Sequence, residues 1–137
     1  MKARVFVLKI HESAENYLET ILILQRKNGQ VRSIDIAGEL SFSKPSVSIA
    51  MKNLRENGYI SVDKEGFITL LEKGKQIAET IYERHTLISD WLIHLGVSPE
   101  TAAKDACRIE HVISSESFEA LKAHANMSAA AAPERKG

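Results

Sequence analysis

Three side chains of the types that bind transition metals share one face of a predicted helix late in the chain. Cys107, Glu110 and His111 stand at positions i, i+3 and i+4 of a helix that begins at Pro99. Thiolate, carboxylate and imidazole are the common ligands of transition-metal ions. Each also has an ordinary explanation, because a helical cysteine is usually a small buried residue and a Glu–His pair is usually solvated. The chemistry alone leaves metal binding and plain helix packing equally open.

Two other segments carry further candidate ligands. Asn16 and Glu19 stand at i and i+3 of the first predicted helix, and His85 lies on a later helix. A catalytic Cys107–His111 pair is another interpretation of the i, i+4 spacing. That pair has no Gly-rich oxyanion loop and no obvious third member in the sequence. We therefore expect no catalytic residue and predict that the chain is not an enzyme.

A second group of residues has the chemistry of a DNA contact. Small hydroxyls and a lysine gather where a recognition helix would begin, and such side chains bond phosphates and base edges without bulk. A further lysine lies in a predicted β-turn, where its acidic neighbours Asp63 and Glu65 weaken its case. The serines could equally cap a helix, and winged helices also serve as protein-interaction modules. The predicted DNA-contacting residues are Ser43, Lys44, Pro45, Ser46, Ser48, Lys52 and Lys64.

The elements that must position these residues begin with two helices. Ser13 is the predicted N-cap of the first, which runs to about Lys27 and ends at the following Asn-Gly pair. Ser33 is the predicted cap of a short second helix. Its buried side is predicted to consist of Ile34, Ala37 and Leu40.

A third helix and a hairpin complete this part of the chain. Pro45 sits where a helix start tolerates proline, and Gly58 is a natural C-terminal stop. Two β-rich runs, residues 59–62 and 67–70, flank a polar turn that contains glycine, which predicts a hairpin. Three helices followed by a hairpin is the order of a winged helix-turn-helix.

The remaining residues predict helices only, so the fold class is mainly α. A long amphipathic helix stops at Gly96, and Ser98-Pro99-Glu100 is a strong start for a helix that runs to about Ile113. Ser114 opens a last short helix. The predicted division is residues 1–75 for the winged helix, 76–126 for a helical domain and 127–137 for a disordered tail.

Composition limits the class of protein. The chain has 137 residues and zero net charge, its first part mildly basic and its remainder acidic. No apolar run approaches the roughly 20 residues of a membrane span, and the N-terminal apolar run is too short for a signal peptide. The single cysteine excludes an internal disulfide framework. We therefore expect a protein of the cytoplasm.

Four segments resemble the diphtheria toxin repressor family of iron- and manganese-dependent repressors. Residues 105–114, Asp-Ala-Cys-Arg-Ile-Glu-His-Val-Ile-Ser, are similar to the metal-binding helix of that family. Residues 13–19 resemble its first helix, 43–48 its recognition helix and 74–85 its domain-linking helix. The length resembles the short two-domain branch of manganese transport regulators.

The resemblance implies a ligand set. Cys107, Glu110 and His111 would bind the principal metal together with Asn16, which stands where the family has Asp or Met. At a second metal site the matching residues are Glu19 and His85. Besides Asn16, three positions depart from the family, since Ser89 replaces an acid, Ala103 a histidine and Ile49 a polar residue of the recognition helix.

These observations predict a metal-dependent transcriptional repressor of metal-uptake genes. It would bind operator DNA as a homodimer when loaded with Fe(II) or Mn(II), with Co(II), Ni(II) or Zn(II) able to substitute in vitro. The dimer is expected from an excess of apolar side chains in the later helices. The alternative is a metal-independent winged-helix regulator that senses a small molecule or oxidation at Cys107. The apolar residues in question are Trp91, Leu92, Leu95, Phe118 and Leu121.

Overall fold

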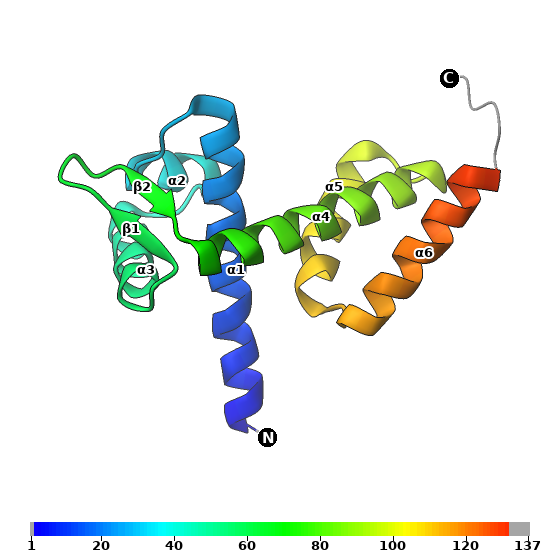
Figure 1. The fold of residues 1–137 in the computed structure, drawn as a ribbon, viewed down its shortest axis with the longest axis horizontal. Coiled ribbons are helices and arrows are strands. Elements are labelled where there is room, and N and C mark those ends of the chain that lie inside the picture. The colour runs from blue at the N-terminus through cyan, green and yellow to red at the C-terminus, as the bar shows by residue number, and fades with distance from the viewer. Residues whose placement is uncertain (1, 132–137) are drawn as a thin grey trace. The chain divides into compact units, whose positions relative to one another are not determined.

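The computed structural model describes the backbone of residues 2–131 and the side chains of residues 12–126. It forms two compact units, Met1–Tyr82 and Glu83–Gly137. The division falls inside one helix, seven residues beyond the end of the DNA-binding domain expected from the sequence. The elements are α1 (Lys2–Asn28), α2 (Ser33–Leu40), α3 (Lys44–Glu56), β1 (Ile60–Val62), β2 (Ile68–Leu70), α4 (Glu72–His94), α5 (Pro99–Val112) and α6 (Ser115–Ala131) (Figure 1).

The first unit confirms the winged helix-turn-helix and the mainly α fold class. Strands β1 and β2 pair antiparallel with Ser61 opposite Thr69, and the backbone N–H of Ile68 also donates to the Val31 carbonyl. The three helices bury their apolar stripes against this small sheet. The core consists of Leu18, Ile21, Leu22, Leu24, Val31, Ile36, Ala37, Val47, Met51, Leu54, Ile60, Ile68 and Ala78.

The start of the first helix is a correction. α1 begins at Lys2, so Ser13 lies inside the helix and is not its N-cap. No glycine or proline precedes Ser13, and nothing in residues 2–12 therefore interrupts the helical backbone. Asn28 and Gly29 end the helix as expected, with Gly29 at φ +87°.

The second helix departs from the prediction in its cap and its buried side. Arg32 is the N-cap, and its backbone N–H donates to the Asp35 carboxylate at 2.9 Å. The buried residues are Ile36 and Ala37, whereas Ile34 is 56% exposed. Ile34 lies about 200° around the helix from Ile36, which explains why only one of the two isoleucines reaches the core.

The turn between the strands is held by its own backbone and one carboxylate. Asp63 accepts from the Phe67 backbone N–H at 2.9 Å, and its carbonyl accepts from Gly66. Gly66 has φ +88°, a conformation that side chains disfavour. The loop Asp63–Phe67 is therefore a defined wing.

The second unit consists of the end of α4 with α5 and α6. Ser98 caps α5 by accepting from the Thr101 N–H, and the Ser114 hydroxyl accepts from Ser117 at the start of α6. Both helix starts were predicted from the sequence. The buried apolar side chains of this unit are Ile88, Ala102, Ala106 and Phe118.

The C-terminal boundary also differs from the expectation. α6 continues to Ala131, so residues 127–131 are helical where a disordered tail was predicted. Alanine has the highest helix propensity, and this segment is rich in it. Residues 132–137 lie outside the described residues. No helix in the described part is long and apolar enough to cross a membrane.

Candidate metal centre and DNA-binding surface

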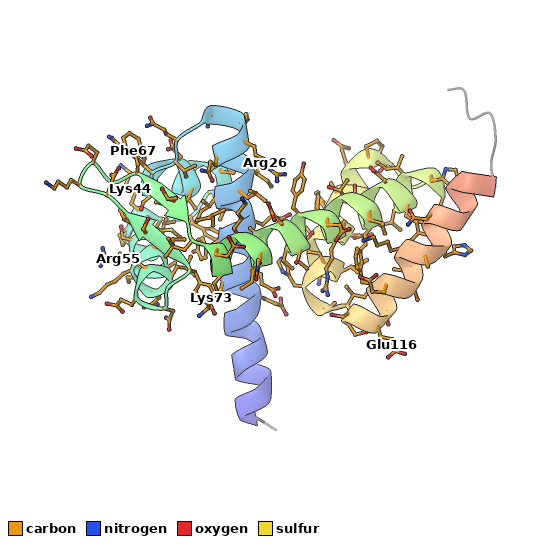
Figure 2. All side chains as sticks on the ribbon, in the orientation of Figure 1. Arg26, Lys44, Arg55, Phe67, Lys73 and Glu116 are labelled. Atoms are coloured by element: carbon orange, nitrogen blue, oxygen red, sulfur yellow. The ribbon has the colours of Figure 1, made fainter. Side chains whose placement is uncertain are left out.

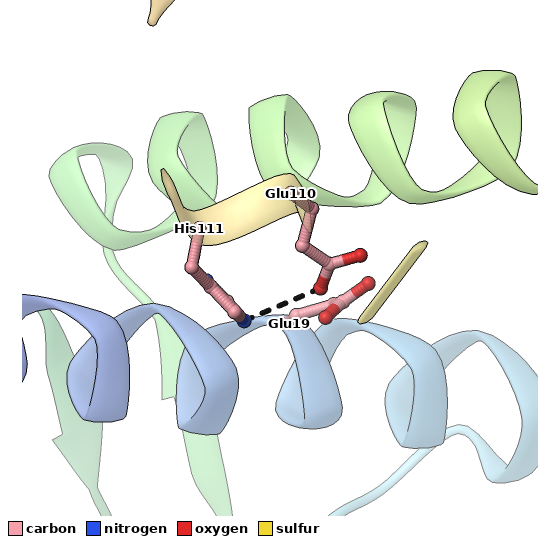
Figure 3. Close-up of side chains that lie close together, drawn as sticks. All are labelled: Glu19, Glu110 and His111. Carbon is pink, nitrogen blue, oxygen red and sulfur yellow. Dashed lines mark ion pairs between the residues drawn. The ribbon is translucent and has the colours of Figure 1, made fainter. Parts of the chain in front are cut away.

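A fully buried carboxylate lies near the end of α5. Glu110, on the last turn of α5, has no exposed surface. The Nδ1–H of His85 donates to Glu110 Oε1 at 2.7 Å, and His111 Nε2 lies 3.3 Å from Glu110 Oε2 (Figure 3). No hydrogen bond from the described residues reaches Glu110 Oε2. A buried carboxylate is costly unless it is fully paired, and the imidazoles of His85 and His111 offset part of the cost of burying Glu110.

The environment of His85 follows from the same carboxylate. Its hydrogen bond to Glu110 raises the pKa of the imidazole above its usual value. Partial burial opposes this rise, whereas the negative charges of Glu110 and Asp90 add to it. The Glu110 carboxylate therefore stabilises a positive charge on the His85 imidazole.

The spacing of the donor atoms fits a bound transition metal. Metal–nitrogen and metal–oxygen bonds of about 2.1 Å place neighbouring ligand atoms roughly 3.0–3.4 Å apart. The 3.3 Å between Glu110 Oε2 and His111 Nε2 lies in this range. An imidazole and a carboxylate are also a chemically suitable pair for Mn, Fe or Zn.

An arginine that the sequence analysis missed fixes the end of α5. Arg84 donates to the backbone carbonyls of Glu110 at 3.2 Å and Ile113 at 3.0 Å, and its guanidinium lies over the Phe118 ring. A cation at a helix C-terminus satisfies carbonyls that have no partner within the helix. Arg84 therefore positions the turn that carries Glu110. The only sequence signal was its place beside His85.

The predicted ligands are distributed over both units. The second unit brings His85, Glu110 and His111 together, and Cys107 lies one turn earlier on α5 with an exposed side chain. Asn16 and Glu19 belong to α1 in the first unit. Asn16 is half-buried and Glu19 is buried.

The outer face of α3 presents the residues predicted to contact DNA. The Ser43 hydroxyl accepts from the Ser46 N–H at 3.3 Å and donates to the Ser46 hydroxyl at 2.8 Å, so Ser43 does cap the helix. The side chains of Lys44 and Arg55 project from α3 in Figure 2. Six of the predicted contacts on and beside α3 are exposed, namely Ser43, Lys44, Pro45, Ser46, Ser48 and Lys52.

Two further cations lie on or beside the wing in the same unit. Lys64 is exposed at the turn, and the Asp63 carboxylate beside it is committed to the Phe67 backbone. Arg32, which the sequence analysis did not select, lies over the Phe67 ring at 4.3 Å. This cation–π contact holds a guanidinium at the base of the wing. Its signal in the sequence was a basic residue directly before α2.

The chain combines a winged helix-turn-helix with a helical unit that holds a buried carboxylate–imidazole cluster. This combination is typical of metal-responsive transcriptional regulators. Residues 9–67 match the family model described as the iron-dependent repressor, N-terminal DNA-binding domain. Residues 71–129 match the iron-dependent repressor, metal-binding and dimerisation domain. The chain therefore belongs to the iron-dependent repressor family and is a metal-dependent transcriptional regulator.

Individual relatives agree with this assignment. The transcriptional regulator MntR of Escherichia coli O157:H7 is 35% identical over 111 residues, which are 81% of this chain and 72% of that protein. The HTH-type transcriptional regulator MntR of Geobacillus kaustophilus is 35% identical over 74% of this chain and 72% of its own length.

Solved structures show the same fold. The manganese regulator SloR superposes with a TM-score of 0.73 at 30% identity over 82% of this chain, and the metal-dependent transcriptional regulator MtsR with 0.76 at 27% identity over 82%. This chain spans 53% of each of those two chains. The comparisons support the metal-dependent interpretation and not the alternative of a metal-independent regulator that senses oxidation at Cys107.

Proposed function

We propose that this chain represses metal-uptake genes in the cytoplasm by binding operator DNA as a homodimer when it is loaded with Fe(II) or Mn(II). The observation that carries the proposal is the cluster around Glu110. A buried carboxylate oxygen that no described hydrogen bond reaches faces the imidazole of His111 at metal-ligand spacing. The winged helix on the same chain supplies the surface that the metal would control.

The proposed ligands come from both units. Cys107, Glu110 and His111 would bind the principal metal with Asn16, and Glu19 and His85 would bind a second ion. A metal held by this proposed ligand set would link α1 to the helices of the second unit. The ligand types would determine which ion binds. Thiolate and imidazole favour later transition metals, whereas carboxylates also accept Mn(II).

Such a metal acts on DNA binding only through its preference for one arrangement of the protein. If that arrangement sets two recognition helices about 34 Å apart, the metal-loaded dimer fits two half-sites. A metal concentration 100-fold above its dissociation constant favours that arrangement by about 2.7 kcal/mol. The expected gain in operator affinity is close to a hundredfold.

The deciding experiment titrates the purified metal-free full chain with Mn(II), Fe(II), Co(II) and Zn(II). Operator affinity is measured at each metal concentration. The parent should gain up to about a hundredfold in affinity. His111→Ala should lose this gain, because it removes an imidazole that faces Glu110. Circular dichroism of this variant without metal checks that it remains folded.

A matched variant separates the switch from the DNA contact. Lys44→Ala removes an exposed cation at the start of α3, so it should weaken DNA binding at every metal concentration and lower the salt dependence by about one unit of slope. Its response to metal should equal that of the parent. If folded His111→Ala still responds to metal like the parent, the proposed ligand set is wrong.

A further inference from the structure

The exposed side of α3 carries one large apolar side chain among mostly polar residues. Ile49, in the middle of α3, is 63% exposed. The buried side of the same helix is complete without it, since Val47, Met51 and Leu54 fill the core. Ile49 therefore has no packing role within the first unit that would explain its type.

The neighbours of Ile49 place it at the centre of the DNA-facing surface. Pro45 and Ser46 precede it by four and three residues, and Lys52 and Asn53 follow by three and four. Residues with these spacings share one face of a helix, and all four are exposed. A recognition helix enters the major groove with such a face, so the Ile49 side chain would meet base edges and not phosphates.

The chemistry of the side chain selects its partner. Isoleucine has no hydrogen-bond donor or acceptor, and the major groove presents one apolar group, the C5-methyl of thymine. β-Branching restricts χ1 of Ile49 within a helix, so little side-chain freedom is lost on contact. We propose that Ile49 is a specificity-determining residue that recognises a thymine C5-methyl in each operator half-site. This inference rests on the operator binding proposed above.

The test uses a chemical change confined to that methyl group. Mn(II)-loaded full chain first selects its best duplex from a random pool, and each thymine of that duplex is then replaced in turn by deoxyuridine. At one position of each half-site the replacement should weaken binding about fourfold, the value of one buried methyl group. Ile49→Ala should bind the thymine and deoxyuridine duplexes equally.

Lys52→Ala is the matched control, because Lys52 is exposed on the same face and carries charge. It should weaken binding to both duplexes by the same factor and retain the fourfold preference for thymine. The inference is overturned if no deoxyuridine replacement weakens the parent, or if Ile49→Ala keeps the preference. Either result would overturn only the role of Ile49, because a protein that selects a duplex still binds operator DNA as proposed. Failure to select any duplex with Mn(II) or Fe(II) overturns both.

Discussion

At the scale of one residue, burial of Glu110 carries a cost that a bound metal ion would offset. Its carboxylate is fully buried, yet it faces two imidazoles, from His85 and His111, and not a permanent cation. Burial of an ionised group without full pairing destabilises a fold by several kcal/mol. A divalent ion at the same place would supply the missing charge, which explains how such a residue contributes to a metal-dependent switch.

Cys107 leads to a prediction about metal preference. Its thiolate favours softer, later ions, so the parent should respond to Fe(II) better than to Mn(II). Cys107→Glu keeps the charge of the ligand but replaces sulfur with oxygen, which Mn(II) prefers. We expect the affinity ratio of Mn(II) to Fe(II), measured by operator binding, to rise on the order of tenfold, equivalent to about 1.4 kcal/mol.

Cys107→Ser controls for loss of the thiolate alone, because a hydroxyl is a weak ligand without charge. It should weaken the response to both metals without favouring Mn(II). An unchanged ratio in Cys107→Glu would mean that this position does not determine the choice of metal.

At the scale of elements, local chemistry was predictable and tertiary packing was not. The caps Ser43 and Ser98 act through residues three positions away, so the sequence contains the whole interaction. The predicted N-cap Ser13 was wrong because a serine also fits inside a helix that nothing interrupts. Phe118 was assigned to a dimer surface but is 3% exposed, because α6 turns it into the second unit.

The candidate metal centre likewise has a part that the sequence predicts and a part that depends on tertiary packing. The spacing of Cys107, Glu110 and His111 on one helix was visible in the sequence. The hydrogen bond between His85 and Glu110 joins residues 25 apart on two helices, and Arg84 contacts carbonyls at the end of α5 that are 26 and 29 residues away. Only the packing of α4 against α5 creates these contacts, so no local pattern could reveal them.

The start of α4 provides a stability prediction. A Cβ added at Gly74 would collide with the Tyr59 carbonyl oxygen and lie 3.3 Å from Leu18 Cδ2. That oxygen accepts from the Leu71 N–H, so it cannot move without loss of a backbone hydrogen bond. Gly74→Ala should destabilise the protein by about 1–3 kcal/mol, measured by urea denaturation of the metal-free chain.

Gly38→Ala is the matched control. Gly38 lies within α2, and an added Cβ would have no atom within 4 Å. The same substitution should therefore raise stability there, by up to about 1 kcal/mol, because alanine is the better helix former. Equal effects at the two glycines would show that contact with Tyr59 is not what requires Gly74.

For the whole molecule, the apolar surface of the second unit predicts self-association. Leu95 is 61% exposed, Val112 69% and Ile93 40%, while Trp91 and Leu92 are half-buried. Together they form more exposed apolar surface than one small helical unit needs. Homodimers are commonly two-fold symmetric, so each such residue acts twice in one interface. We expect the parent chain to sediment as a dimer at tens of micromolar.

Leu95→Glu tests which surface forms that dimer. Two symmetric copies of the new charge would replace two buried leucines, and each leucine contributes about 1.5–3 kcal/mol when buried. The dissociation constant of the dimer, measured by sedimentation equilibrium, should therefore rise by about a hundredfold or more. Gln30→Glu introduces the same charge at an exposed position of the first unit and should leave this constant unchanged. A parent that sediments as a monomer with and without metal would contradict the dimer itself. An undisturbed Leu95→Glu dimer would place the interface elsewhere on the chain.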